Sequence, residues 1–140
     1  GMQWPSDLIG YDTIHSYGSP SYWAQVMFGS YLGDQTLKSE AEGAGGKFFY
    51  SITKDSAKKE LYLKLVNASS VAQPVTIDLS GAKVASTAKL VSLSAPDTQA
   101  TNSIDDPERI IPVGSTVQVS SQFSHTLPPF SIQVVQLDEQ

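Results

Sequence analysis

The first residues that could carry out chemistry are two glutamates, Glu40 and Glu42. Two positions apart on a β-strand, their carboxylates would lie on one face, about 7 Å from each other. Carboxylate pairs at about 5–9.5 Å hydrolyse glycosidic bonds by retaining or inverting mechanisms. Nothing nearby in the sequence indicates the apolar pocket that a catalytic acid needs, so we favour a solvated edge strand over an acid–base pair.

Two aspartates and two histidines are the other polar candidates. Asp105 and Asp106 precede a proline in SIDDPERI, which is typical of a turn, and the regular oxygen spacing of a calcium loop is missing. His15 and His125 are far apart in the sequence, and no third residue completes a Ser-His-Asp arrangement. The sequence therefore predicts no catalytic residue, no metal site and no cofactor.

Aromatic residues on strands could instead stack on sugar rings. Strand alternation places Phe48 and Tyr50 on one face and Phe49 on the other. We expect Phe48 and Tyr50 to line the core and Phe49 to be partly covered; the alternative is a sugar platform formed by Phe49 or Tyr62. Asn67-Ala68-Ser69 also matches a glycosylation sequon, which carries little weight in an unknown host.

Composition narrows the class of protein. The chain has 140 residues, the size of one ordinary domain, and no cysteine. Its net charge is -5 with only nine Lys and Arg, which argues against a nucleic-acid partner. The sequence shows no run of eighteen apolar residues, so it predicts a soluble chain without a membrane segment.

The N-terminus lacks the basic and apolar regions of a signal peptide. We interpret Gly1 as a scar of tag removal on a segment cut from a longer chain. Such a cut would also account for the missing signal, so the compartment stays open, with the periplasm or secretion compatible with a parent enzyme.

The elements that must position these residues begin with a short strand at 8–12, a loop and a helix at 20–32. Ser19 stands at the N-cap, Pro20 at the first helical position and Gly33 at the expected stop. Apolar residues at helical spacing predict one buried face, formed by Trp23, Val26, Met27 and Tyr31.

After residue 35 the hydrophobic period changes from about 3.6 to about 2, which indicates strands. Turn-forming stretches such as EGAGG, KDSAKK and SGAK separate them. The pattern predicts an antiparallel β-sandwich or jelly roll. Its expected strands are 36–42, 47–53, 60–67, 73–79, 87–94, 116–121 and 130–137.

Two of these strands have informative patterns. Alternation in KKELYLKLV predicts a buried face with Leu61, Leu63 and Leu65 and a wetter face with Glu60, Tyr62 and Lys64. The adjacent valines of IQVVQL predict either burial on both faces or a bulge, and Pro128-Pro129 should mark the start of this last strand.

Three stretches resemble the C-terminal end of family 51 glycoside hydrolases, the α-L-arabinofuranosidases. They are WPSDLIGYDTIHSYGSPSYWAQVMF, LYLKLVNAS, and ATNSIDDPERIIPVGSTV continuing to LPPFSIQVVQL. Together they span almost the whole chain in the family's order. The third has one residue more than expected between its asparagine and proline, which affects a loop only.

The resemblance implies a (β/α)8 barrel that leads into a C-terminal sandwich. Residues 1–34 would then be the remnant of barrel strand eight and helix eight, and residues 35–140 the sandwich domain. The family's catalytic glutamates would precede Gly1, and no residue here matches their motifs. Tyr11, Asp12 and Thr13 could face substrate in a complete enzyme or simply pack and connect.

The leading hypothesis is a non-catalytic accessory domain that stabilises the barrel of an enzyme acting on arabinose-containing plant polysaccharides. The alternative is a stand-alone carbohydrate-binding or adhesion module, and a third, weaker one is a small hydrolase using Glu40 and Glu42. Without the upstream barrel as partner, the chain should expose apolar side chains within 4–28 or cover them by self-association.

Overall fold

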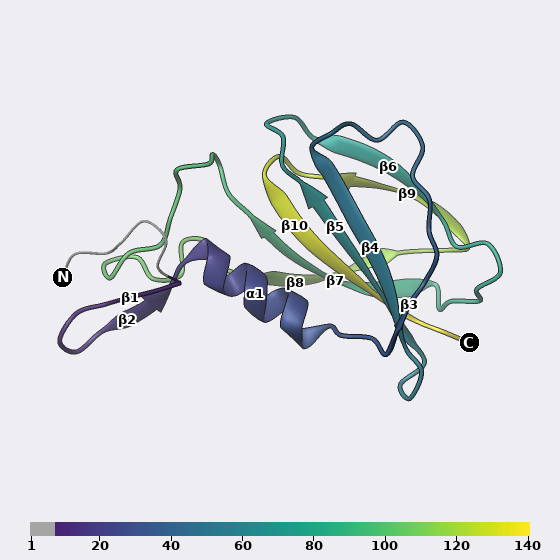
Figure 1. The fold of residues 1–140 in the computed structure, drawn as a ribbon, viewed down its shortest axis with the longest axis horizontal. Helices are drawn as coiled ribbons and strands as arrows, with labels where there is room; N and C mark the ends of the chain where they lie inside the picture. Colours follow the sequence, from purple (N-terminus) through teal and green to yellow (C-terminus); the bar gives the residue numbers. More distant parts are fainter. Residues whose placement is uncertain (1–7) are drawn as a thin grey trace.

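A computed structural model describes residues 8–140 and shows a mainly β fold with one helix in that range (Figure 1). In chain order the elements are β1 (Ile9–Tyr11), β2 (Ser16–Gly18), α1 (Pro20–Ser30), β3 (Gln35–Thr36), β4 (Phe48–Asp55), β5 (Glu60–Asn67), β6 (Gln73–Asp78), β7 (Thr87–Ser94), β8 (Val113–Gln118), β9 (Gln122–Leu127) and β10 (Ser131–Asp138).

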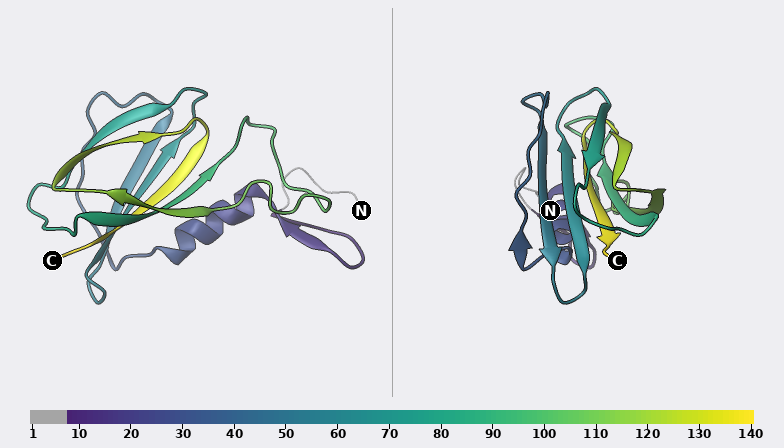
Figure 2. Two further views of the ribbon diagram at one scale, coloured as in Figure 1. Left: turned by 180° about the vertical axis from the view of Figure 1, so that it is seen from behind. Right: turned by 90° about the vertical axis from the view of Figure 1, so that its right-hand side faces the viewer.

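The main body consists of two antiparallel layers. A six-stranded sheet has the order β3-β4-β5-β10-β7-β8, and the pair β6-β9 forms the second layer (Figure 2). The remaining strands, β1 and β2, form a hairpin at the far end of α1 from the sandwich (Figure 1). This arrangement confirms the predicted antiparallel sandwich with one preceding helix.

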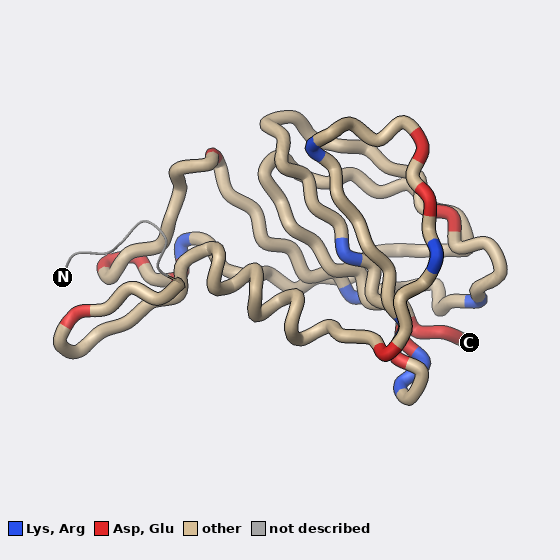
Figure 3. Tube along the Cα trace, in the orientation of Figure 1, with Lys and Arg blue, Asp and Glu red and all other residues tan. Residues whose placement is uncertain are grey.

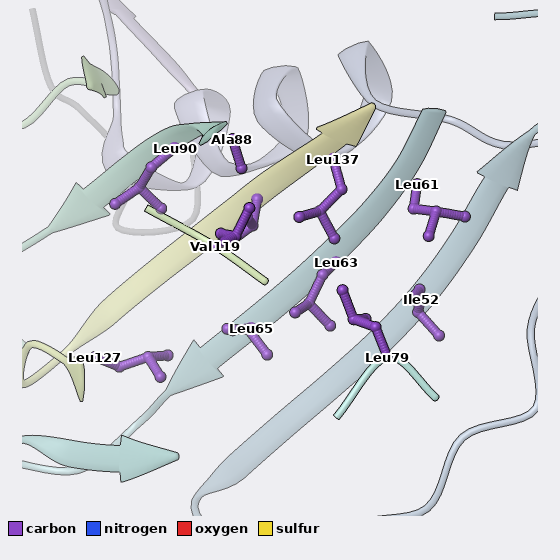
Figure 4. Close-up of a cluster of buried hydrophobic side chains, with 11 residues drawn as sticks. Ile52, Leu61, Leu63, Leu65, Leu79, Ala88, Leu90, Val119, Leu127 and Leu137 are labelled. Carbon is purple, nitrogen blue, oxygen red and sulfur yellow. The ribbon is translucent and has the colours of Figure 1, made fainter. Parts of the chain in front are cut away.

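The inner faces of the two layers enclose an aliphatic core. Alternate residues of β4, β5, β7 and β10 point into it, as the period of two requires. Figure 4 shows this cluster, whose buried members are Ile52, Leu61, Leu63, Leu65, Leu79, Ala88, Leu90, Val119, Leu127, Val135 and Leu137.

A second cluster covers the opposite face of the six-stranded sheet, where α1 packs. Met27 of α1 is buried with Leu93 of β7, Val134 of β10 and Ile110 from the segment between β7 and β8. β10 pairs with β5 in an unbroken register from Ser131 to Asp138, so it has no bulge along β5. Of the two predicted options for the last strand, burial on both faces is the correct one.

The predicted wetter face of β5 is wrong for Tyr62, which is only 2% exposed. The end of α1 covers it: the rings of Tyr31 and Tyr62 meet edge to face with centroids 5.7 Å apart. Lys64 Nζ donates to the carbonyl oxygen of Phe28 at 3.1 Å and lies 5.4 Å from the centre of the Phe28 ring. Burial lowers the pKa of Lys64.

Helix α1 begins as predicted and ends earlier. Ser19 is the N-cap, and its Oγ accepts from the Tyr22 amide at 3.2 Å, while Pro20 is the first helical residue. The helix ends at Ser30 rather than at residue 32. Val26, placed on the buried face by the sequence pattern, is 38% exposed because the packed face is formed by Trp23, Ala24, Met27, Phe28 and Tyr31.

Several strand predictions need correction. The segment 36–42 is not a strand beyond Thr36, and β8 begins three residues before the predicted 116. β2 was predicted as a loop and β9 was not predicted at all. The segment after β3 leaves the sheet and reaches a turn at Gly43, whose φ of 66° favours glycine.

Asn102 connects three parts of the chain. Its side chain is 1% exposed, and its Nδ2 donates to the carbonyl oxygens of Gly18 at 2.8 Å and Ile110 at 2.9 Å. Its Oδ1 accepts from the Ile110 amide at 2.7 Å. Asn102 therefore holds the segment between β7 and β8 against the end of β2, beside the start of α1.

A partly buried polar cluster centres on Glu60. The Tyr62 hydroxyl donates to its Oε2 at 2.5 Å, and Gln136 Nε2 donates to its Oε1 at 2.8 Å. Burial raises the pKa of Tyr62, and the hydrogen bond to Glu60 adds to this effect. The phenol therefore stays protonated in the folded chain at a pH where the unfolded chain has begun to ionise it.

Replacing Asn102 should destabilise the fold strongly. Asn102→Ala leaves the buried peptide groups of Gly18 and Ile110 without partners, which costs about 1–3 kcal/mol in free energy of unfolding. Urea denaturation of the two proteins measures the difference. Exposed Gln118→Ala is the control and should change stability by less than about 0.5 kcal/mol; equal effects would show that Asn102 does not pin the two segments.

Tyr62 should make stability fall at alkaline pH. Its pKa is raised by folding, so its contribution is fully present below pH 10.0 and is lost as the pH rises through the higher folded value. Stability measured from pH 9 to pH 11 should therefore fall more steeply in the wild type than in Tyr62→Phe, which lacks the titrating group. Parallel curves for the two proteins would contradict this assignment.

Candidate functional site

Glu40 and Glu42 lie on an exposed segment rather than on a strand. This segment, residues 37–47, joins β3 to β4 along the edge of the sandwich, and its acidic positions are red in Figure 3. Glu40 Oε1 lies 3.5 Å from Lys38 Nζ, and both side chains are more than four-fifths exposed. The premise of a strand that holds both carboxylates on one face is therefore wrong.

Both glutamates nevertheless border a cleft of about 680 Å³ between the two layers. One wall comes from β4 and β5, the other from β6, and residues 39–44 form the rim. The rings of Phe48 and Tyr50 are stacked in this cleft with centroids 6.1 Å apart and an angle of 18°. The Tyr50 hydroxyl donates to the carbonyl oxygen of Ser39 at 3.3 Å, which ties the wall to the rim.

Sequence reasoning missed this cleft. Phe48 and Tyr50 were correctly placed toward the core, and both pack at its margin. The apolar alternation of β6, with Val75 and Ile77, was also visible in the sequence. What local patterns do not show is that the second layer has only two strands in the described chain, β6 and β9, and leaves part of the inner face of the larger sheet uncovered.

Of the two aromatic residues considered for an alternative sugar platform, only Phe49 lies at the surface. Phe49 is 55% exposed, so the prediction that a neighbouring segment partly covers it is wrong. Tyr62 is buried and unavailable to a sugar, which corrects that candidate. The sequon is also unusable in this fold, because Asn67 is buried and its Nδ2 donates to the carbonyl oxygens of Val71 at 2.8 Å and Pro128 at 2.9 Å.

The hairpin turn contains the residues expected near a barrel mouth. Asp12 Oδ1 accepts from the amides of Ile14 at 2.9 Å and His15 at 2.7 Å, which lowers the pKa of Asp12. The imidazole of His15 adds to this effect at 3.3 Å from the carboxylate. Tyr11 is 73% exposed beside the turn, and Thr13 is exposed within it.

The other polar candidates have structural partners. The Asp106 amide donates to Ser103 Oγ at 3.1 Å, which confirms a turn at this aspartate pair. His125 on β9 lies 2.6 Å from Gln133 Oε1 through its Nε2, between the two layers. Within residues 8–140, no group of three or more His, Cys, Asp or Glu side chains is arranged to hold a metal ion.

Most of the large hydrophobic residues that are exposed in the described chain lie in its N-terminal part. Six of the nine large hydrophobic residues that are exposed in the described chain precede β3, namely Leu8, Ile9, Tyr11, Ile14, Val26 and Leu32. Five of these six lie within the range 4–28 where exposure is expected, and positions 4–7 lie outside the described residues. The only helix among the described residues is too short to cross a membrane.

Comparison with known proteins agrees with this architecture. The family model for the α-L-arabinofuranosidase C-terminal domain matches residues 3–131. The probable α-L-arabinofuranosidase A of Aspergillus niger is 34% identical over 136 residues, which are 95% of this chain and 21% of that protein. The α-L-arabinofuranosidase 1 of Arabidopsis thaliana is 27% identical over 137 residues, which are 92% of this chain and 20% of that protein. The chain thus spans about one fifth of the length of these curated relatives.

Solved structures show the same fold. An arabinose-bound family 51 α-L-arabinofuranosidase, MgGH51, superposes with a TM-score of 0.91 and 35% identity, over 99% of this chain and 22% of that one. The α-L-arabinofuranosidase of Thermotoga maritima has a TM-score of 0.85 at 21% identity, over 94% of this chain and 31% of that one. Because the family model matches nearly all of this chain, the chain belongs to the α-L-arabinofuranosidase C-terminal domain family.

Proposed function

We propose that this chain is the non-catalytic C-terminal part of a retaining α-L-arabinofuranosidase that acts on arabinose-containing plant polysaccharides. Its role is to stabilise a catalytic (β/α)8 barrel that precedes it in the polypeptide. The observation that carries the proposal is the exposed apolar surface of the β1–β2 hairpin and the outer side of α1, on a chain that matches the C-terminal part of such enzymes.

In this proposal, residues 1–34 supply the last strand and last helix of the barrel, and residues 35–140 form the sandwich. One side of α1 packs on the six-stranded sheet through Trp23, Met27 and Tyr31. The other side presents Val26, 38% exposed, and the helix is followed by Leu32, 64% exposed. A helix between two layers needs apolar residues on both sides, and this distribution supports a barrel as the second layer.

The sandwich would act as a rigid base for the barrel's final element. Ser19 caps the start of α1, directly after the hairpin. Asn102, from the segment between β7 and β8, donates to the carbonyl oxygen of Gly18 at the end of β2 and so fixes the hairpin and the helix start against that segment. At the other end, Lys64 donates to the carbonyl oxygen of Phe28. A cation at a helix C-terminus complements the helix dipole, and α1 has no basic residue of its own in the last turn.

The competing functions have less support. A stand-alone adhesion module with a surface aromatic platform would depend on Phe49 alone, since Tyr62 is buried. A hydrolase using Glu40 and Glu42 would need a fixed pair, whereas Glu40 lies on an exposed segment beside Lys38. Neither arrangement explains the exposed apolar surface before β3.

A domain exchange tests the proposal. In the α-L-arabinofuranosidase A of Aspergillus niger, the matching C-terminal fifth would be replaced by this chain. The chimera should fold and hydrolyse a chromogenic arabinofuranoside, while the 140-residue chain alone should release no product. Activity of the isolated chain, or a chimera that behaves as two independently unfolding parts, would contradict the assignment.

The same chimera identifies the contact surface. Ile9→Asp should change the stability of the isolated chain by less than about 0.5 kcal/mol, because Ile9 is 49% exposed there. In the chimera the new carboxylate would be buried against the barrel without a partner and should lower the unfolding temperature by several degrees. Val71→Asp, at a site 69% exposed in the β5–β6 turn, is the control. Equal effects of both variants in the chimera would exclude the hairpin as the contact.

A further inference from the structure

We propose that the cleft between β4–β5 and β6 binds a short neutral oligosaccharide. This inference goes beyond the proposed stabilising role and does not depend on it, since every group involved belongs to the sandwich. The cleft volume of about 680 Å³ is typical of ligand sites, which measure about 300–1,000 Å³.

The cleft exists because the second layer is narrow. β6 pairs only with β9 in the described chain, so the inner faces of β4 and β5 extend beyond the cover that this pair provides. Instead of a further strand, residues 39–44 form one side of the opening. The cleft is therefore open to solvent along the edge of the sandwich, where an extended chain could enter from the side.

The walls suit the apolar face of a sugar ring. Phe48 and Tyr50 are both half-buried and lie nearly parallel, with an interplanar angle of 18°. Such rings offer flat surfaces against which the C–H groups of a sugar can pack. The hydrogen bond from the Tyr50 hydroxyl to Ser39 fixes that ring before a ligand arrives, so little side-chain entropy is lost on binding.

The rim suits the hydroxyl groups of the same sugar. Glu40 and Glu42 line the cleft, and ionised carboxylates are pure hydrogen-bond acceptors that pair with hydroxyl donors. Gln73, on the same face of β6 as Val75 and Ile77, adds an amide that can both donate and accept. A ligand with apolar faces and many hydroxyls satisfies both the walls and the rim.

The charge of the rim selects against other ligands. Among the described residues that line the cleft, none is Lys or Arg, so phosphates and acidic sugars would be repelled. A basic peptide is disfavoured because Glu40 is already near Lys38, which neutralises part of the rim. The lining thus favours an uncharged polyol over either an anion or a cationic peptide.

An NMR titration of the full 140-residue chain tests the inference, with α-1,5-arabinotriose, xylotriose, a glucuronic acid oligomer and trilysine as probes. A neutral trisaccharide at millimolar concentration should cause saturable shifts in the amides of residues 39–44 and 73–79. Glu40→Ala/Glu42→Ala should weaken binding about two- to tenfold for each lost hydrogen bond. These residues are exposed, so the variant should keep the fold, which its unperturbed remaining spectrum would verify.

Phe49→Ala is the matched control, because Phe49 lies on the opposite face of β4 from Phe48 and Tyr50. It should leave the affinity unchanged. No saturable shift with either neutral trisaccharide would overturn the inference, as would shifts that depend on Phe49. Binding of trilysine alone, abolished by salt, would show a peptide-binding rim instead. Each of these results can occur whether or not the chimera is active, so the two proposals fail independently.

Discussion

Burial of β10 on both of its faces is the constraint on which the rest of this structure depends. Val134 and Val135 are adjacent in sequence and point to opposite sides of the sheet, yet they are 1% and 0% exposed. Val135 belongs to the core between the layers, and Val134 belongs to the cluster beneath α1. A central strand of this kind requires cover on both sides, so α1 is an integral part of the sandwich and not an appendage to it.

This requirement also explains the shape of the N-terminal elements. Once Met27 and Trp23 are packed on the sheet, the opposite side of α1 has no partner within the described chain. The hairpin lies beyond the sandwich at the start of α1, as Figure 1 shows. Asn102 donates to the carbonyl oxygen of Gly18 at the end of this hairpin. The apolar residues left exposed there are the ones that the proposed barrel would cover.

The sequence predicted those parts of the fold that depend on local chemistry. The Ser19 cap, the start of α1 at Pro20 and the leucines of β5 follow from hydrogen bonding and alternation within a few residues. The environment of Tyr62 could not be predicted in this way, because the helix that covers it lies 30 or more positions earlier. β9 was missed because its sequence, QFSHTL, has few apolar residues, and only its last residue, Leu127, is buried.

The candidate site was harder to predict than the fold. The hydrophobic period predicted a strand over 36–42, but pairing ends at Thr36 and the segment with Glu40 and Glu42 leaves the sheet there. The cleft that these glutamates border arises from the number of strands in each layer, which no local pattern specifies. The exposure of apolar residues before β3, by contrast, was predicted, because the family resemblance implied a barrel upstream that would otherwise cover them.

Amide hydrogen exchange of the isolated chain tests the central claim most directly, since it measures the opening free energy of each element. If α1 is part of the sandwich, its amides from Ala24 to Ser30 should exchange through the same global unfolding as those of β10, with equal free energies. The amides of β1 and β2 should exchange much faster, because that two-stranded hairpin lies outside the layers of the sandwich. Fast exchange throughout α1 beside a fully protected β10 would contradict the account, because it would show that the strand does not need the helix.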